Sequence, residues 1–314
     1  MLVVALLHVL CVQAWADPAS HWPWPAFKPL EGGSVFEYVA LQDAQMHNGT
    51  FRSLLAAIKD PQAQAKYREI DAQWQAGQLA VPCVWSRRMG LVKLADGVLV
   101  YSPVELLPDV RSALQRLGGV TTIVLPNREH AIHWESWNRA WPNAHVILPQ
   151  GIHLPSWANP LEVGPGAIPE AVKKILQDFS IEVIGQTGFP EVVLQHQSSG
   201  TLLTSDFVYF GSKDKKDMSG RPQVGACTDL YYDAFVRPGP SDVLLPTYRL
   251  GLSEVDKRNI SQSLQRILAW GPRQILSAHA GRVSSGGKDE AAAILKGSWS
   301  WCETQVAEPT LLML

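Results

Sequence analysis

The sequence predicts an α/β fold with mixed sheets, and three observations carry that prediction. From residue 89 onward, short apolar runs of strand length alternate with segments of helical periodicity, as in layered α/β proteins. Two hairpin signals interrupt the alternation, so antiparallel as well as parallel strand neighbours are expected. Hydrophobic residues make up 46% of the chain and charged residues 18%, which indicates a large buried core and excludes a largely disordered chain.

The first 16 residues predict a leader. They are apolar apart from His8 and Gln13 and end in small residues, like a secretory signal with its cleavage site. A buried first helix or an incomplete gene model are the alternatives. The leader would direct the chain to the secretory pathway or to an organelle. No later apolar run reaches ~18 residues, so we expect no transmembrane span in the mature chain.

Residues 17–85 predict an N-terminal extension. Its first part, up to residue 49, is rich in proline and aromatic residues and is expected to wrap irregularly around the domain. Thr50 is a candidate N-cap for a helix through Lys59, and Pro61 begins a second helix that Gly77 ends.

Residues 86–303 are expected to form the main domain, and residues 304–314 a C-terminal tail. Asp96 and Gly97 form the strongest short hairpin signal, between two apolar runs. Residues 211–247 are polar and rich in proline and glycine, and predict a long loop. The expected strands are residues 91–94, 98–101, 122–125, 144–148, 181–184, 191–196, 201–205 and 274–277. The expected helices are residues 108–117, 134–141, 169–179, 254–270 and 288–302.

Composition and motif searches exclude several function classes. The formal net charge of -2 argues against a dedicated nucleic-acid binder. The four cysteines are far apart, which excludes a zinc ribbon or a thioredoxin motif. The sequence contains no P-loop, no G-x-S-x-G elbow, no dinucleotide-binding glycine pattern after a strand, and no H-E-x-x-H. Trp134, Trp137 and Trp141 follow helical spacing and predict a packed helix face.

Three polar features follow predicted strands directly, where α/β sheets commonly place their sites. Residues 127–133 follow the strand at 122–125, Asp206 follows the strand at 201–205, and His279 follows the strand at 274–277. A carboxylate and imidazoles that converge on one edge are suitable ligands for a divalent metal. The sequence therefore predicts a metal site built from His130, Asp206 and His279.

The order of these parts resembles the metallo-β-lactamase superfamily, in particular a little-studied branch described as a domain of unknown function. The matching stretches are the hairpin at 91–101, the loop at 127–133, Thr204-Ser205-Asp206 and the late His279. Further stretches that match this branch are residues 94–97, 101–103, 137, 142–144, 191–193, 201–203 and 299–301. The resemblance covers about residues 86–303 and implies an αββα-type layered fold with mixed sheets behind an N-terminal helical extension.

The same resemblance implies a degenerate metal site. Aligned at the strand end, the family's H-x-H-x-D-H ligands fall on Asn127, Glu129, Ala131 and Ile132, of which Glu129 alone is a plausible ligand. Gln186 stands where the family has a histidine. The expected metal ligands are His130, Asp206 and His279, with Glu129, His133 and Gln186 as secondary candidates, and Asp206 and His279 as catalytic residues.

Three functions remain open from the sequence. The first is a metal-dependent hydrolase with a reduced, mononuclear site that holds one zinc or iron ion and acts on an unidentified small molecule. The second is a metal-free, non-catalytic descendant of the fold that binds a small molecule or a protein and needs no cofactor. The third is metal-free acid–base chemistry by an Asp206–His279 pair.

Overall fold

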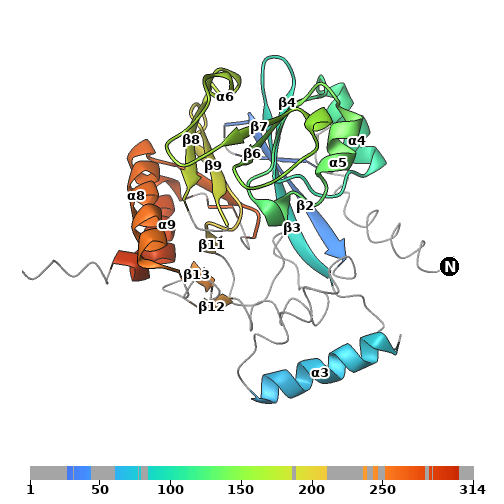
Figure 1. The fold of residues 1–314 in the computed structure, drawn as a ribbon, viewed down its shortest axis with the longest axis vertical. Helices are drawn as coiled ribbons and strands as arrows, with labels where there is room; N and C mark the ends of the chain where they lie inside the picture. The colour runs from blue at the N-terminus through green and yellow to red at the C-terminus, as the bar shows by residue number, and fades with distance from the viewer. Residues whose placement is uncertain are drawn as a thin grey trace, which may run out of the picture.

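A computed structural model describes most of the predicted main domain and parts of the extension (Figure 1). The described residues are 27–30, 32–43, 61–76, 78, 84–185, 189–210, 236–238, 243–246, 252–279, 283–284 and 286–303. The predicted leader, the predicted helix at 50–59, Gln186 and the predicted C-terminal tail lie outside them.

A seven-stranded mixed sheet forms the N-terminal half of the fold, with its strands in sequence order. The first four strands pair antiparallel and the last four pair parallel. The strands are β1 (Lys28–Pro29), β2 (Val35–Asp43), β3 (Val84–Lys93), β4 (Val98–Tyr101), β5 (Val120–Val124), β6 (His145–Pro149) and β7 (Pro160–Val163).

Gly97 makes the predicted hairpin between β3 and β4. Its φ of +156° is a conformation that side chains rarely adopt, and an added Cβ would lie 2.6 Å from Thr121 Cγ2. The turn therefore requires glycine both for its backbone angle and for space. The hairpin predicted from Asp96-Gly97 is confirmed.

A second, four-stranded sheet has the order β14-β10-β9-β8. The predicted hairpin pairs β9 with β10 antiparallel, and β10 pairs with β14 in parallel. Its strands are β8 (Phe179–Ile184), β9 (Glu191–His196), β10 (Thr201–Thr204) and β14 (Gln274–Ser277). A small third sheet contains β11 (Tyr209–Phe210), β12 (Val236–Pro238) and β13 (Val243–Pro246).

The two larger sheets pack face to face and helices cover their outer faces, which confirms the αββα layering. The core between the sheets joins Leu99 and Val124 of the first sheet to Val192 and Leu276 of the second. Outside the first sheet lie α4 (Pro108–Arg116) and α5 (Trp134–Ala140), and outside the second lie α8 (Glu254–Trp270) and α9 (Gly287–Glu303) (Figure 1). The remaining helices are α3 (Pro61–Gln75), α6 (Glu170–Ile175), η2 (Arg128–His130) and η3 (Ser156–Ala158).

The helices largely agree with the sequence prediction. Trp137 is fully buried, and Trp134 and Trp141 pack against the same core cluster, so the predicted tryptophan face is confirmed. Ser253 caps α8 in a reciprocal capping box with Asp256. The second helix of the predicted extension is present as α3. The helix predicted at 169–179 is shorter, because β8 begins at Phe179.

Several strands correct the sequence prediction. Residues 35–43 are not irregular, since β2 pairs with β3 along its whole length. The segment expected to be a loop at 211–247 contains β12 and β13. β7 was also missed; it is an edge strand and begins at Pro160, a position where proline is tolerated. The domain boundaries themselves stay a prediction.

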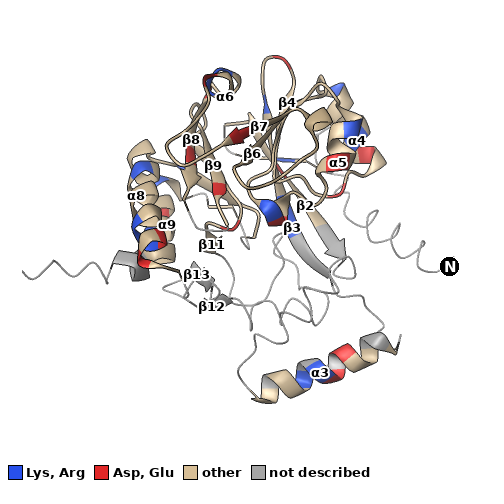
Figure 2. Cartoon of the chain, viewed as in Figure 1, with Lys and Arg blue, Asp and Glu red and all other residues tan. Residues whose placement is uncertain are grey.

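Charges of both signs are mixed on the helices. Basic and acidic residues both occur on α3, α4, α5 and α8 (Figure 2). None of the helices in the described part of the chain is long and apolar enough to cross a membrane.

Candidate metal centre

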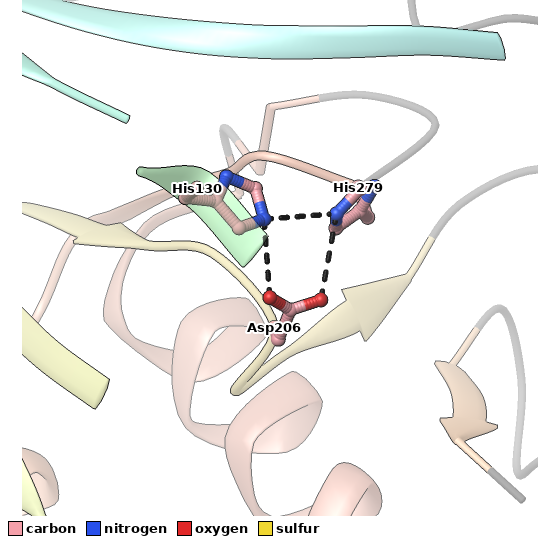
Figure 3. A group of neighbouring side chains, drawn as sticks. All are labelled: His130, Asp206 and His279. Atoms are coloured by element: carbon pink, nitrogen blue, oxygen red, sulfur yellow. Dashed lines mark hydrogen bonds and ion pairs between the residues drawn. The ribbon is translucent and has the colours of Figure 1, made fainter. Parts of the chain in front are cut away.

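Three strand ends bring His130, Asp206 and His279 together across the two sheets (Figure 3). His130 lies on η2, shortly after β5 of the first sheet, whereas Asp206 and His279 follow β10 and β14 of the second. One ligand atom from each residue lies within 4.8 Å of the others. The sequence therefore predicted correctly which residues meet; their role as ligands stays a prediction.

The donor atoms face one another at short distances. His130 Nε2 lies 3.0 Å from Asp206 Oδ2 and 3.1 Å from His279 Nε2. His279 Nε2 lies 3.4 Å from Asp206 Oδ1. The side chain of His130 is fully buried and that of His279 is 13% exposed, so the group opens toward solvent on the His279 side.

The electrostatics favour a neutral imidazole beside an ionised carboxylate. Burial lowers the pKa of His130, the positive charge of Arg87 lowers it further, and together they outweigh Asp206. Burial raises the pKa of Asp206, but His130, His279 and a hydrogen bond from Tyr209 outweigh it and hold that pKa well below its usual value. A neutral histidine and an ionised aspartate are the forms in which these side chains bind metals.

Both oxygens of Asp206 accept further hydrogen bonds. Asn127 Nδ2 donates to Oδ2 at 2.7 Å, and the hydroxyl of Tyr209 donates to Oδ1. The ring of Tyr209 also stacks on His279, with the planes 5° apart and the centroids 5.4 Å apart. Tyr209 therefore holds two of the three members of the group in position.

Glu191 fixes the turn that carries Asp206. This buried carboxylate accepts hydrogen bonds from Thr204 Oγ1 and Ser205 N at 2.8 Å, and from Asp206 N at 2.9 Å. Glu191 therefore holds the end of β10. From the sequence, Glu191 was predicted only as the first residue of a strand.

Ser102 holds the far side of the His130 ring. Its Oγ lies 2.6 Å from His130 Nδ1, and the residue is fully buried. Ser102 has a φ of +57°, in the left-handed region that costs a non-glycine residue about 1–2 kcal/mol. The backbone therefore keeps a strained conformation at the point where this hydroxyl orients a candidate ligand.

The strain predicts an order of stability for two variants of Ser102. Both Ser102→Ala and Ser102→Gly lose the contact with His130, but only glycine also relieves the left-handed backbone. We expect Ser102→Gly to exceed Ser102→Ala by about 1 kcal/mol in the free energy of unfolding, measured by urea denaturation. An alanine variant at least as stable as the glycine variant would contradict the strain.

Two of the three secondary candidates do not join the group. Glu129 is exposed and pairs with Arg128 at 3.5 Å. His133 occupies the N-cap position of α5 and is not among the residues that converge. Gln186 lies outside the described residues. Four contributors were missed, namely Ser102, Asn127, Glu191 and Tyr209; for Asn127 a signal existed, since asparagine is a favoured N-cap before a helical turn.

Comparisons with known proteins give structural matches alone. No protein-family model matches the chain, and no curated protein matches it. The metallo-β-lactamase DIM-1 exposed to ceftazidime is similar at a TM-score of 0.46 and 13% identity, over 88% of this chain and 96% of that chain. A metallo-β-lactamase from Erythrobacter litoralis is similar at a TM-score of 0.47 and 10% identity, over 91% and 99%.

Two further solved structures have named metal forms. The mono-zinc form of FIM-1 from Pseudomonas aeruginosa has a TM-score of 0.45 and 11% identity, over 90% of this chain and 96% of that chain. A peroxy diiron species of the chemotaxis sensor ODP has a TM-score of 0.44 and 12% identity, over 69% and 90%. Metallo-β-lactamases, the family that the sequence resembles, are thus among the solved structures similar to this chain, at low identity.

Proposed function

We propose that the chain is a metal-dependent hydrolase with a mononuclear site held by His130, Asp206 and His279. The observation that carries the proposal is the convergence of two imidazole nitrogens and a carboxylate within 4.8 Å. Three protein ligands with one position left open is the arrangement of catalytic zinc sites. Such a site is reduced relative to the two-ion sites of the superfamily that the sequence resembles.

The distances in the group fit one small cation. Ligand bonds of ~2.0–2.2 Å imply that the ligands of a tetrahedral ion lie about 3.3–3.5 Å apart. The two imidazole nitrogens lie 3.1 Å apart, and each lies near a different oxygen of Asp206, His130 Nε2 at 3.0 Å from Oδ2 and His279 Nε2 at 3.4 Å from Oδ1, so small movements bring the three side chains to that spacing. Zinc and iron both accept nitrogen and carboxylate ligands, and either ion suits the donor set.

The tautomer of His130 separates a metal-binding group from a metal-free one. With the proton on Nδ1, the imidazole donates to Ser102 and turns a bare Nε2 toward Asp206 and His279. Electron-rich atoms at these distances repel one another unless a cation lies between them. With the proton on Nε2, His130 donates to Asp206 and the group satisfies itself without an ion.

The residues of the chain would divide the work of hydrolysis. A bound zinc or iron ion supplies the Lewis acidity that activates water for attack on an ester, an amide or a phosphoester. His279 is the most exposed member of the group, so it is the one that a substrate would contact first. Asp206 is held by Asn127 and Tyr209, so its carboxylate keeps one orientation through the reaction.

Metal analysis of the purified full-length chain tests the proposal. We expect about one equivalent of zinc or iron in the wild type, and less than about 0.1 equivalent in Asp206→Ala and His279→Ala. His153→Ala is the matched control, because His153 is exposed and distant in sequence from the group; it should retain the metal. A wild type with less than about 0.1 equivalent of zinc, iron or manganese, also after reconstitution, would overturn the proposal.

The second candidate function is a metal-free binding module for a small molecule or a protein. The hydrogen-bonding distances within the group favour it, because His130 Nε2 and Asp206 Oδ2 at 3.0 Å can form a direct hydrogen bond. A hydrolase loses turnover of chromogenic esters or phosphoesters on chelation and regains it with zinc or iron. A binding module shows no such turnover, and a stable wild type free of metal would support it.

A further inference from the structure

We infer that Asn127 is a positioning residue that sets His130 against Asp206, so that one amide side chain holds the two halves of the candidate metal site in register. The expected effect on metal binding rests on the proposed function. The positioning of His130 against Asp206 does not, because it follows from contacts within the chain. In the sequence, Asn127 is only the residue that stands where the family has a histidine ligand.

The oxygen of the amide holds the turn that carries His130. Asn127 is fully buried, and its Oδ1 accepts hydrogen bonds from Glu129 N at 3.0 Å and from His130 N at 3.2 Å. Asn127 is thereby the N-cap of η2, the single turn that ends at His130. The orientation of His130 relative to β5 therefore depends on this oxygen.

The nitrogen of the amide holds the carboxylate partner. Nδ2 lies 2.7 Å from Asp206 Oδ2, 2.9 Å from Ser205 Oγ and 3.3 Å from Glu191 Oε2. All three acceptors belong to the second sheet, at or near the end of β10. Because His130 follows β5 of the first sheet, the amide bridges the two sheets at the site itself.

The amide has one orientation. The two backbone N–H groups on its oxygen side can only donate and therefore require an acceptor, and the carboxylate oxygens of Asp206 and Glu191 lie on its nitrogen side. A flipped amide would place NH2 against two donors and an oxygen against two carboxylates, at a cost of several unsatisfied buried groups. The side chain therefore transmits a fixed distance between the His130 turn and Asp206.

Asn127→Ser separates the two functions of the amide. Serine is also a favoured N-cap, so its hydroxyl retains an acceptor for η2, but it lacks the NH2 that reaches Asp206. Ser253→Ala is the matched control, since it removes an N-cap from α8 and leaves the candidate site intact.

Metal titration of the full-length variants gives the first result. We expect the dissociation constant for zinc to rise 10–100-fold in Asn127→Ser, which is the effect typical of removing a hydrogen-bond partner of a metal ligand. Ser253→Ala should lower the melting temperature by about 2–4 °C without changing that constant. A constant in Asn127→Ser within two-fold of the wild type, or an equal weakening in Ser253→Ala, would overturn the inference.

The nitrogen chemical shifts of the His130 ring in metal-free protein give the second result. We expect Asn127→Ser to change the shifts of Nε2 and Nδ1, because the ring moves relative to Asp206, and Ser253→Ala to leave them unchanged. Unchanged shifts in Asn127→Ser would overturn the inference even if the wild type binds zinc. If the wild type binds no metal but the His130 shifts still change in Asn127→Ser, the positioning role of Asn127 is supported and the hydrolase proposal fails.

Discussion

Replacing Glu37 with alanine should lower the free energy of unfolding by about 3–5 kcal/mol. The Glu37 carboxylate accepts a hydrogen bond from Arg88 Nε at 2.6 Å, and the side chains of Glu37 and Arg88 are 8% and 1% exposed. The variant leaves a buried guanidinium without its carboxylate, and an uncompensated buried charge is far more costly than a lost surface ion pair. Urea denaturation followed by circular dichroism measures the change.

Lys28 provides the control for Glu37. Its ammonium lies 3.3 Å from the same carboxylate, but its side chain is 78% exposed, so water screens the pair. Lys28→Ala should cost no more than about 1 kcal/mol. The double variant Glu37→Leu/Arg88→Met should recover most of the stability that Glu37→Ala loses, because it removes both charges. Equal losses in Glu37→Ala and Lys28→Ala would contradict the buried ion pair.

The ion pair also bears on the candidate site. Arg88 Nη1 donates to the carbonyl of Ser277 at 3.2 Å, and Arg88 N donates to the carbonyl of Ala278 at 3.0 Å. These bonds join β3 of the first sheet to the end of β14, directly before His279. Arg88 and Asn127 thus bridge the sheets at two different strand ends, one next to each imidazole.

The meeting of His130, Asp206 and His279 could be predicted because it follows from local rules. Each residue comes shortly after an apolar strand, and the carboxyl ends of strands β5, β10 and β14 lie at one edge of the layered sheets. Strand length and hydrophobic runs identify those ends without knowledge of the partners. The prediction of the fold class used the same local information.

β2 could not be predicted, because the contact that stabilises it joins residues far apart in the sequence. Val35 and Phe36 are buried on opposite faces, and the next residue is the charged Glu37, which obscures a strand pattern. The partner that makes Glu37 tolerable there, Arg88, lies 51 residues away in the sequence. A buried charge is favourable only with such a partner, and a single sequence does not show the pair.

The residues that support the site were missed for the same reason. Glu191 and Asn127 are polar residues in or next to apolar strands, and each could equally face solvent. Their value lies in contacts with Asp206, 15 and 79 residues further along the chain. The secondary ligands Glu129 and His133 were selected by sequence proximity to His130, whereas the short turn η2 directs His130 alone into the group.

Replacing Trp299 with alanine should lower the free energy of unfolding by about 3–5 kcal/mol. The side chain lies on α9, is 1% exposed, and packs in the core between the second sheet and its helices. Its ring stacks on Phe207 at 5.0 Å, and its Nε1 donates to the carbonyl of Phe207 at 3.0 Å. Trp157→Ala is the matched control: Trp157 is 55% exposed, and its ring contact with Trp134 is worth about 1 kcal/mol.

Trp299→Phe separates packing from hydrogen bonding at this position. Phenylalanine keeps most of the ring contact with Phe207 but lacks the N–H. The free energy of unfolding of Trp299→Phe should therefore fall by about 1 kcal/mol for the lost hydrogen bond, in addition to the loss from the smaller ring. Phe207 follows Asp206 directly, and its carbonyl is therefore one peptide away from the candidate ligand. If Trp299 anchors that peptide, Trp299→Phe also changes the nitrogen shifts of His130 and His279. A loss of stability in Trp299→Ala no larger than in Trp157→Ala would contradict the packing of α9 against this turn.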